Sequence, residues 1–142
     1  DATNTAAVNK LKKLKGNKIF SIIAPSKRWI RQNCTVNDHI EDHLEMLPGR
    51  YTLVLNLREG HKISKDVNNG LNTIGIRIPR SWSHEISALL NRPLATSAAP
   101  ASDEHFMTCM ENLSRDIRNH IDFCIYDGEI KGRSISVIKL TN

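Results

Sequence analysis

The chain has 142 residues and is 39% hydrophobic, which is enough to bury one core and suits a single domain. It has no run of roughly 18 or more apolar residues, and its first residues lack the basic and apolar regions of a signal peptide, so we expect a soluble intracellular protein, cytoplasmic or in another internal compartment, without membrane contact. The formal charge of +5 and the pI near 9.3 favour polyanionic partners, nucleotides or RNA, between which charge alone does not decide.

The first part of the chain predicts one helix and one strand. Apolar residues repeat at helical spacing from Ala7 to Leu14, and Gly16 is a suitable C-terminal end for this helix, whose outer face is rich in lysine. Residues 19–24 form a short run rich in isoleucine that Pro25 closes. Because the run is too short for a helix, it predicts a buried strand.

The middle of the chain predicts a second helix followed by two strands. Ile40 and Leu44 indicate a helix that starts near Asp38 and stops before Pro48. Residues 51–57 are β-branched and aromatic enough for a strand, and residues 73–78 are predicted to form the next one. The polar residues 59–72 between them predict an exposed connection.

The last part of the chain predicts two helices, a loop and a pair of strands. Apolar side chains from Trp82 to Leu90 indicate an amphipathic helix, and the small residues 98–102 indicate a loop. A helix is predicted at about 114–120, and strands at 123–126 and 134–140 flank a turn at 128–132. Short turns such as Asp127-Gly128 suit antiparallel neighbours, so the whole pattern predicts an α/β fold with a mixed sheet.

Three stretches carry a family resemblance: residues 48–55 (PGRYTLVL), 73–79 (TIGIRIP) and 93–98 (PLATSA). In order and spacing they resemble the YrdC/Sua5 family of L-threonylcarbamoyladenylate synthases, and the similarity covers nearly the whole chain. The resemblance implies one domain over residues 1–142, with a twisted mixed parallel/antiparallel sheet and flanking helices. The family pattern begins with a strand and a PT-x-T-x-YGL motif that helps to hold threonine. The sequence lacks both, so the chain is either a fragment or a form without that strand.

The resemblance also implies a reaction. L-threonine, bicarbonate and ATP, with Mg²⁺ accompanying the nucleotide, would give threonylcarbamoyl-AMP and pyrophosphate for the N6-threonylcarbamoyladenosine modification of tRNA. No covalent enzyme intermediate is expected. The expected partners are therefore ATP, L-threonine and bicarbonate, with RNA (tRNA) as a further candidate, and no P-loop or dinucleotide-binding motif offers another nucleotide site.

The main site prediction that the resemblance implies is a concave basic cleft where five residues converge: Lys15, Thr73, Arg77, Ser97 and Arg133. The resemblance implies that Lys15 binds the phosphates or the carbamate and that Arg77 binds the carboxylate of threonine. Both are the expected catalytic residues. Thr73 is expected to contact the nucleotide and Ser97 to contact threonine. A planar guanidinium on a strand is a good carboxylate ligand because it donates two parallel hydrogen bonds.

Three more nucleotide contacts are expected by the same resemblance, namely Thr108, Arg133 and Ser136. Other positions depart from the family pattern. Asn17 replaces the arginine of the KxR motif, Ala99 replaces the asparagine of S-x-N, and Ile135 and Lys139 replace a serine and an aspartate near the end. Three neighbouring lysines are candidates to replace the lost cation: Lys12, Lys13 and Lys18.

These altered positions leave a second hypothesis open, a catalytically degenerate module that binds RNA or serves as a structural subunit of a larger assembly. The altered positions favour this module, whereas the complete strand motif around Thr73 and Arg77 favours the enzyme. Trp29 and Trp82 lie near basic residues, a composition that fits either RNA stacking or ordinary core and interface packing.

We predict no protein-bound metal and no disulfide framework. His39 and His43 are four residues apart on a predicted helix but have no third ligand with suitable spacing. The three cysteines, Cys34, Cys109 and Cys124, are an odd number without CxxC spacing, so reduced thiols are expected.

Overall fold

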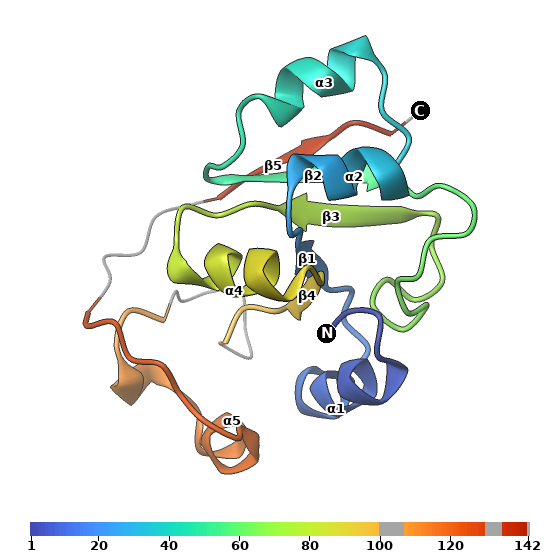
Figure 1. Ribbon diagram of the computed structural model, residues 1–142. Helices are drawn as coiled ribbons and strands as arrows, with labels where there is room; N and C mark the ends of the chain where they lie inside the picture. The colour runs from blue at the N-terminus through green and yellow to red at the C-terminus, as the bar shows by residue number, and fades with distance from the viewer. Residues whose placement is uncertain (100–106, 130–134, 142) are drawn as a thin grey trace.

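The computed structural model describes residues 1–99, 107–129 and 135–141 (Figure 1). The helices are α1 (Thr5–Lys15), α2 (Lys27–Asn33), α3 (Asp38–Leu44), α4 (Trp82–Leu90), the 3₁₀ helix η1 (Met110–Asn112) and α5 (Arg115–His120). The strands are β1 (Ser21–Ile23), β2 (Tyr51–Asn56), β3 (Thr73–Arg77), β4 (Leu94–Thr96) and β5 (Ser136–Lys139).

The centre of the molecule is one mixed sheet. Its strand order is β4-β1-β3-β2-β5. Strand β1 runs parallel to β3 and β2 runs parallel to β5, whereas the β1–β4 and β2–β3 pairs are antiparallel. The predicted α/β fold with a mixed sheet and flanking helices is thus confirmed.

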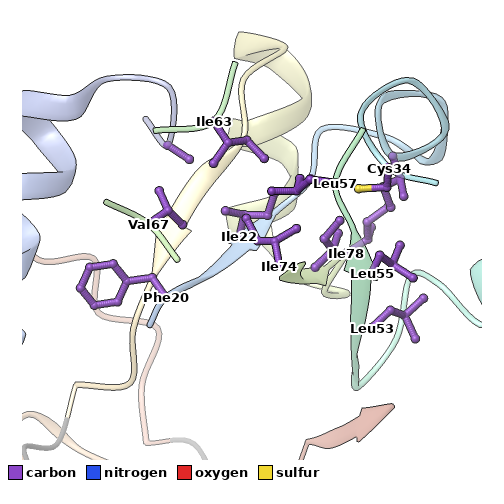
Figure 2. Packing of buried hydrophobic residues seen from close by; sticks show 14 of the residues in the cluster. Phe20, Ile22, Cys34, Leu53, Leu55, Leu57, Ile63, Val67, Ile74 and Ile78 are labelled. Atoms are coloured by element: carbon purple, nitrogen blue, oxygen red, sulfur yellow. The ribbon is translucent and has the colours of Figure 1, made fainter. Parts of the chain in front are cut away.

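One face of the sheet forms the hydrophobic core. The register aligns Ile22, Ile76 and Leu53 across three neighbouring strands, and all three side chains are fully buried. Figure 2 shows Ile22 and Leu53 in the same cluster as Val67, whose segment is distant from both strands in the sequence. The cluster also contains buried residues of α1, α2 and α3, namely Val8, Ile30, Ile40 and Leu44.

The first helix begins and ends where the sequence predicts. The side chain of Asn4 accepts a hydrogen bond from the backbone N–H of Ala7 at 3.1 Å, which caps the N-terminus of α1. At the other end Gly16 has a φ of 71°, which a residue without Cβ adopts at little cost. These two residues fix where the lysine-rich C-terminal turn of α1 meets the chain that leads into β1.

Helix α2 is a feature that the sequence analysis did not predict. Ser26 caps it by accepting from the N–H of Trp29 at 3.1 Å. Trp29 is partly buried against the core, and its basic neighbours Lys27 and Arg31 form ion pairs with glutamates of the α3 region. Of the two roles left open for Trp29, core packing is the one observed.

The segment 59–72 was predicted to be an exposed connection, and this prediction is only partly correct: the segment contains no helix or strand and its two ends are exposed, but part of its middle is buried. Ile63 and Val67 belong to the core cluster, as Figure 2 shows, and Asn68 is buried as well. The amide of Asn68 donates to the carbonyl oxygens of Leu71 and Thr73 at 2.6 and 2.9 Å. The sequence did not reveal the buried part of the segment, because its polar side chains are satisfied there by backbone groups.

The predicted C-terminal hairpin is also wrong. Residues 123–126 do not form a strand, and the side chains of Phe123 and Tyr126 are exposed. The predicted second strand exists as β5, but it pairs in parallel with β2. The turn residues at 127–128 indicated that the last strand would pair with the segment just before it in the sequence. It pairs instead with β2, which is distant in the sequence.

Helix α4 is present as predicted, but it does not bury its apolar stripe. The residue it buries is Ser87, whose hydroxyl donates to the carbonyl oxygens of Ile23 and Arg92. Trp82 and Leu89 are exposed. Figure 1 shows α4 beside β1 and β4, where Ser87 attaches it to the sheet.

No helix among the described residues is long and apolar enough to cross a membrane.

Candidate functional site

The second face of the sheet carries a different set of side chains. The register aligns Ser21 of β1 with Gly75 of β3, and Gly75 with Val54 of β2. Because side chains alternate along a strand, Thr73 and Arg77 lie on this same face. We call it the cleft face, since it forms the base of an open cleft of about 450 Å³.

Residues of all five strands and of their flanking segments line the cleft. The lining is Lys18, Ile19, Phe20, Ser21, Thr52, Val54, Leu71, Thr73, Ile74, Gly75, Thr96, Ser97, Ala98 and Val137. Two predicted site residues, Thr73 and Ser97, are therefore brought into one cleft, although they are distant in the sequence. Its volume is in the range typical of sites for small molecules.

One part of the lining is rich in hydroxyl groups. Ser21 Oγ and Thr96 Oγ1 lie 3.2 Å apart, and Thr96 Oγ1 also donates to the carbonyl oxygen of Ser21 at 3.2 Å. Ser97 Oγ donates to the carbonyl oxygen of Ala98 at 3.4 Å, which is a long hydrogen bond. Ser97 is exposed and can exchange this weak bond for one to a ligand.

Gly75 keeps the base of the cleft open. A Cβ at this position would lie 3.1 Å from Thr52 Cγ2 and 3.3 Å from Ser21 Cβ. Any side chain here would press on both neighbours and project from the cleft face. A glycine inside a strand has no side chain to pack against its neighbours. It often marks a place where a ligand or another backbone approaches the strand closely.

Arg77 lies on the cleft face two residues beyond Gly75, outside the residues that line the cleft itself. Its side chain is half-buried, and desolvation by burial lowers the pKa of its guanidinium. No described residue forms a hydrogen bond or an ion pair with that guanidinium. A partly desolvated cation without a protein anion is a suitable site for an anionic ligand.

Lys15 reaches the rim of the cleft from the last turn of α1. Its Nζ donates to the carbonyl oxygen of Ala99 at 3.0 Å, next to the lining residue Ala98. This contact joins two predicted motifs, KxR and S-x-N. Since it uses the backbone of residue 99, it does not depend on the asparagine side chain that Ala99 replaces.

The remaining predicted positions are placed differently. Thr108 donates to Asn112 Oδ1 at 3.3 Å beside η1, away from the cleft lining. Ser136 alternates with Val137 on β5, and Val137 is the one that lines the cleft. Arg133 lies outside the described residues. Lys139 is exposed and pairs with Val54, so it is on the cleft face.

Sequence reasoning missed several cleft residues, most clearly Ser21, Thr96 and Gly75. Strand alternation provided a usable signal for Gly75, because it lies between Thr73 and Arg77 at a spacing of two. Ser21 offered a weaker signal, as a lone hydroxyl within an apolar run. Thr96 offered none, because its place beside Ser21 depends on the antiparallel β1–β4 pair.

A mixed sheet with one buried face and, on the other face, a cleft lined by hydroxyl groups defines an α/β domain with a cleft of the size typical of small-molecule sites. The family model for Sua5, YciO and YrdC proteins, described as "Telomere recombination", matches residues 1–142. The chain belongs to this Sua5/YciO/YrdC family. The resemblance expected from residues 48–55, 73–79 and 93–98 is thereby confirmed.

Known relatives agree with this assignment. The chain is 29% identical over 148 residues to a Methanocaldococcus jannaschii protein assigned as a threonylcarbamoyl-AMP synthase, and the match covers 99% of this chain and 67% of that protein. Two structures of P. abyssi Sua5, a double variant and a complex with L-threonine, give TM-scores of 0.87 and 0.81 at 25% identity. They match 100% and 99% of this chain, which spans 43% of theirs.

The structure of E. coli YciO supports the fold alone. It gives a TM-score of 0.82 at 17% identity, over 100% of this chain and 71% of that chain. Together these comparisons relate the chain to threonylcarbamoyl-AMP synthases at the level of the family.

Proposed function

We propose that this domain forms L-threonylcarbamoyl-AMP from L-threonine, bicarbonate and ATP, releasing pyrophosphate and water, as a step toward N6-threonylcarbamoyladenosine in tRNA. The observation that carries the proposal is the gathering of Thr73, Arg77 and Ser97, from two separate motifs, on and around one cleft face. In a domain of this family, these residues match the needs of an amino acid and a nucleotide.

Arg77 would bind the carboxylate of threonine. Its guanidinium is half-buried and has no partner among the described residues, so a carboxylate would compensate a cation that the fold has already partly desolvated. The complex of P. abyssi Sua5 with L-threonine supports an amino acid site in this domain. The hydroxyethyl side chain of threonine would lie toward the hydroxyl group of Ser97.

ATP would occupy the rest of the cleft. Exposed aliphatic side chains line its other part, and Ile19, Leu71 and Val137 are 55%, 50% and 68% exposed. Exposed aliphatic groups gathered in one cleft are suitable for the flat face of a base. We therefore propose that the adenine lies against them and that the phosphates lie near Lys15 at the C-terminal end of α1.

Catalysis would rest on positioning and on charge stabilisation. The amine of threonine and bicarbonate form a carbamate with loss of water, and the carbamate oxygen then bonds to the α-phosphorus as pyrophosphate leaves. Negative charge grows on the leaving pyrophosphate, so Lys15 at the rim would stabilise it. Mutual orientation of the two substrates would come from the backbone-anchored cleft rather than from a covalent enzyme intermediate.

Magnesium would enter with the nucleotide. Among the described residues that line the cleft there is no carboxylate, and the described part of the chain holds no cluster of three metal-ligating side chains. The donor set therefore fits a metal held by ATP phosphates and water, which would neutralise phosphate charge.

The test is a pyrophosphate-release assay with ATP, Mg²⁺, L-threonine and bicarbonate, combined with mass spectrometry of the adenylate. We expect release that needs both threonine and bicarbonate, and a product with the mass of threonylcarbamoyl-AMP. A folded protein that binds ATP and threonine in calorimetry but makes no adenylate would contradict the synthase and support the degenerate module.

A further inference from the structure

We propose that a small hydrophilic molecule with a carboxylate or a phosphate group binds in a hollow between α2 and the C-terminal end of α4. The hollow has a volume of about 350 Å³, which is in the lower part of the range for small-molecule sites. The described residues that line it are Ser26, Arg28, Trp29, Gln32 and Asn91, and none of them lines the cleft. The hollow is therefore separate from the site assigned to ATP and threonine, and the inference goes beyond the proposed function.

Both walls of the hollow are attached to the same end of β1. On the α4 side, the hydroxyl of Ser87 donates to the carbonyl oxygen of Ile23 at 3.2 Å. On the same side, His84 Nε2 lies 3.1 Å from the carbonyl oxygen of Pro25. On the α2 side, Trp29 packs against the hydrophobic core. The two helices are thus held in place before a ligand arrives, which lowers the cost of ordering the site on binding.

The charge of the hollow comes from Arg28. Its basic neighbours on α2 are both neutralised: Lys27 pairs with Glu45 at 3.0 Å. Arg31 pairs with Glu41. Arg28 forms no ion pair or side-chain hydrogen bond with another described residue, and the described lining of the hollow contains no carboxylate. Because a guanidinium donates two parallel hydrogen bonds to a carboxylate or a phosphate, the hollow favours an oxyanion.

Two carboxamide groups extend the polar lining. The side chains of Gln32 and Asn91 form no hydrogen bond with another described residue. Each carboxamide offers two N–H donors and one carbonyl acceptor. Ser26 contributes less, because its hydroxyl oxygen already accepts from the backbone N–H of Trp29 at 3.1 Å. One cation beside two carboxamides fits an oxyanion on a body that carries hydroxyl or amide groups.

The protein carries its own spectroscopic probe of the hollow. Of its two tryptophans, Trp29 lines the hollow, whereas Trp82 is exposed on α4 and does not line it. We expect titration of the full chain with malate or glycerol phosphate to shift the indole N–H signal of Trp29 in heteronuclear NMR spectra. The signal of Trp82 should stay in place. Sodium chloride at the same ionic strength should shift neither signal, which controls for screening.

Arg28→Gln tests the cation, and Arg50→Gln is its matched control. Arg50 is an exposed arginine just before β2 and does not line the hollow, so each variant removes one positive charge. We expect Arg28→Gln to weaken binding of the probe roughly 10- to 100-fold, the usual effect of losing a charged hydrogen bond. Arg50→Gln should leave the dissociation constant of the probe unchanged.

Asn91→Gly separates ligand binding from folding. Asn91 ends α4 in the left-handed conformation, with a φ of 48°, and glycine adopts this conformation at little cost. The variant therefore keeps the end of the helix while it removes the carboxamide. Its melting temperature without ligand should be equal or higher, and the probe should bind roughly 2- to 10-fold more weakly. Thermal denaturation and NMR titration measure these two quantities.

The outcomes distinguish the two chemical groups and define failure. A response of Trp29 to malate alone identifies a carboxylate, a response to glycerol phosphate alone identifies a phosphate, and a response to both supports a site for either group. The proposal is overturned if Trp29 responds to neither probe or if Trp29 and Trp82 shift equally. Equal weakening in Arg28→Gln and Arg50→Gln also overturns it. None of these measurements uses adenylate synthesis, so their failure is distinct from failure of the proposed function.

Discussion

The two faces of the sheet use alternate residues of the same strands for opposite purposes. In β3, Ile74 and Ile76 are buried in the core, whereas Thr73, Gly75 and Arg77 between them lie on the cleft face. In β2 the same alternation separates Leu53 from Val54. The core face is apolar and tightly packed. The cleft face combines hydroxyl groups, a glycine and a partly desolvated arginine.

This difference implies a division between stability and binding. Apolar residues of the core face contribute through area removed from water, so their loss should destabilise the fold. Polar residues of the cleft face have their groups only partly satisfied, so their loss should act on ligands. Neighbouring residues in one strand therefore offer matched pairs for separating the two effects.

The largest expected effect on the cleft side is that of Arg77→Ala. We expect kcat/KM for L-threonine to fall roughly 100-fold or more, since a bidentate carboxylate contact to a desolvated arginine is lost. The free energy of unfolding should stay the same or rise slightly, because a half-buried cation is removed. Steady-state kinetics and chemical denaturation measure the two quantities.

Arg80→Ala is the control for this variant. Arg80 is exposed just beyond β3 and donates to the carbonyl oxygen of Pro48. The Arg80→Ala variant should leave kcat/KM for L-threonine unchanged. Equal losses in both variants would show that net charge, and not the Arg77 site, governs activity.

The core side is tested by Ile76→Ala, one residue from Arg77 and fully buried. We expect the free energy of unfolding to fall by about 2–4 kcal/mol from lost burial and the cavity left behind. At a temperature where the variant remains folded, the KM values should not change. A variant that keeps its stability but loses threonine binding would break the proposed division between the two faces.

Gly75→Val is expected to have a smaller effect, again on the cleft side. The new side chain meets Thr52 and Ser21 and projects from the base of the cleft, so ligand affinity should fall about tenfold. Calorimetry with ATP and threonine measures this change. Gly75→Ala should have a weaker effect in the same direction, and an unchanged affinity in both variants would place the ligands elsewhere.

The smallest expected effect concerns pH and Cys34, which is buried on the core side. Burial raises the pKa of the Cys34 thiol from 9.0 to about 12. Between these values the unfolded chain releases the thiol proton and the folded chain keeps it. The stabilisation is therefore complete below pH 9 and decreases as pH rises, by about 1.4 kcal/mol per unit.

Comparison with a Cys34→Ala variant isolates this contribution. The difference in free energy of unfolding between the two proteins should shrink by about 1 kcal/mol from pH 9 to pH 10, because the unfolded thiol is only half ionised at pH 9. A thiol reagent at pH 8 should also label the exposed Cys124 in the native protein while Cys34 stays unlabelled until denaturation. Rapid labelling of native Cys34 would show that this part of the core opens.

Several errors of sequence reasoning have a common cause. The 59–72 segment contains Ser64 and Asn68, which are polar yet buried, because backbone groups and neighbouring hydroxyls satisfy them. The apolar stripe of α4 predicts burial, yet the hydroxyl of Ser87 faces the sheet. In both places a specific hydrogen bond outweighed the general tendency of apolar residues to be inside.

The sequence by itself determined which segments become α1, α3, α4, β2 and β3, since helical and alternating periodicities are local properties of the chain. It also carried the family resemblance and the identities of Thr73, Arg77 and Ser97. Only the tertiary structure decided that β5 pairs with β2, that Ser97 meets Thr73 in one cleft, and that Lys18, not Lys12, lines it. These outcomes depend on strand pairing and on contacts between distant residues, which no local pattern encodes.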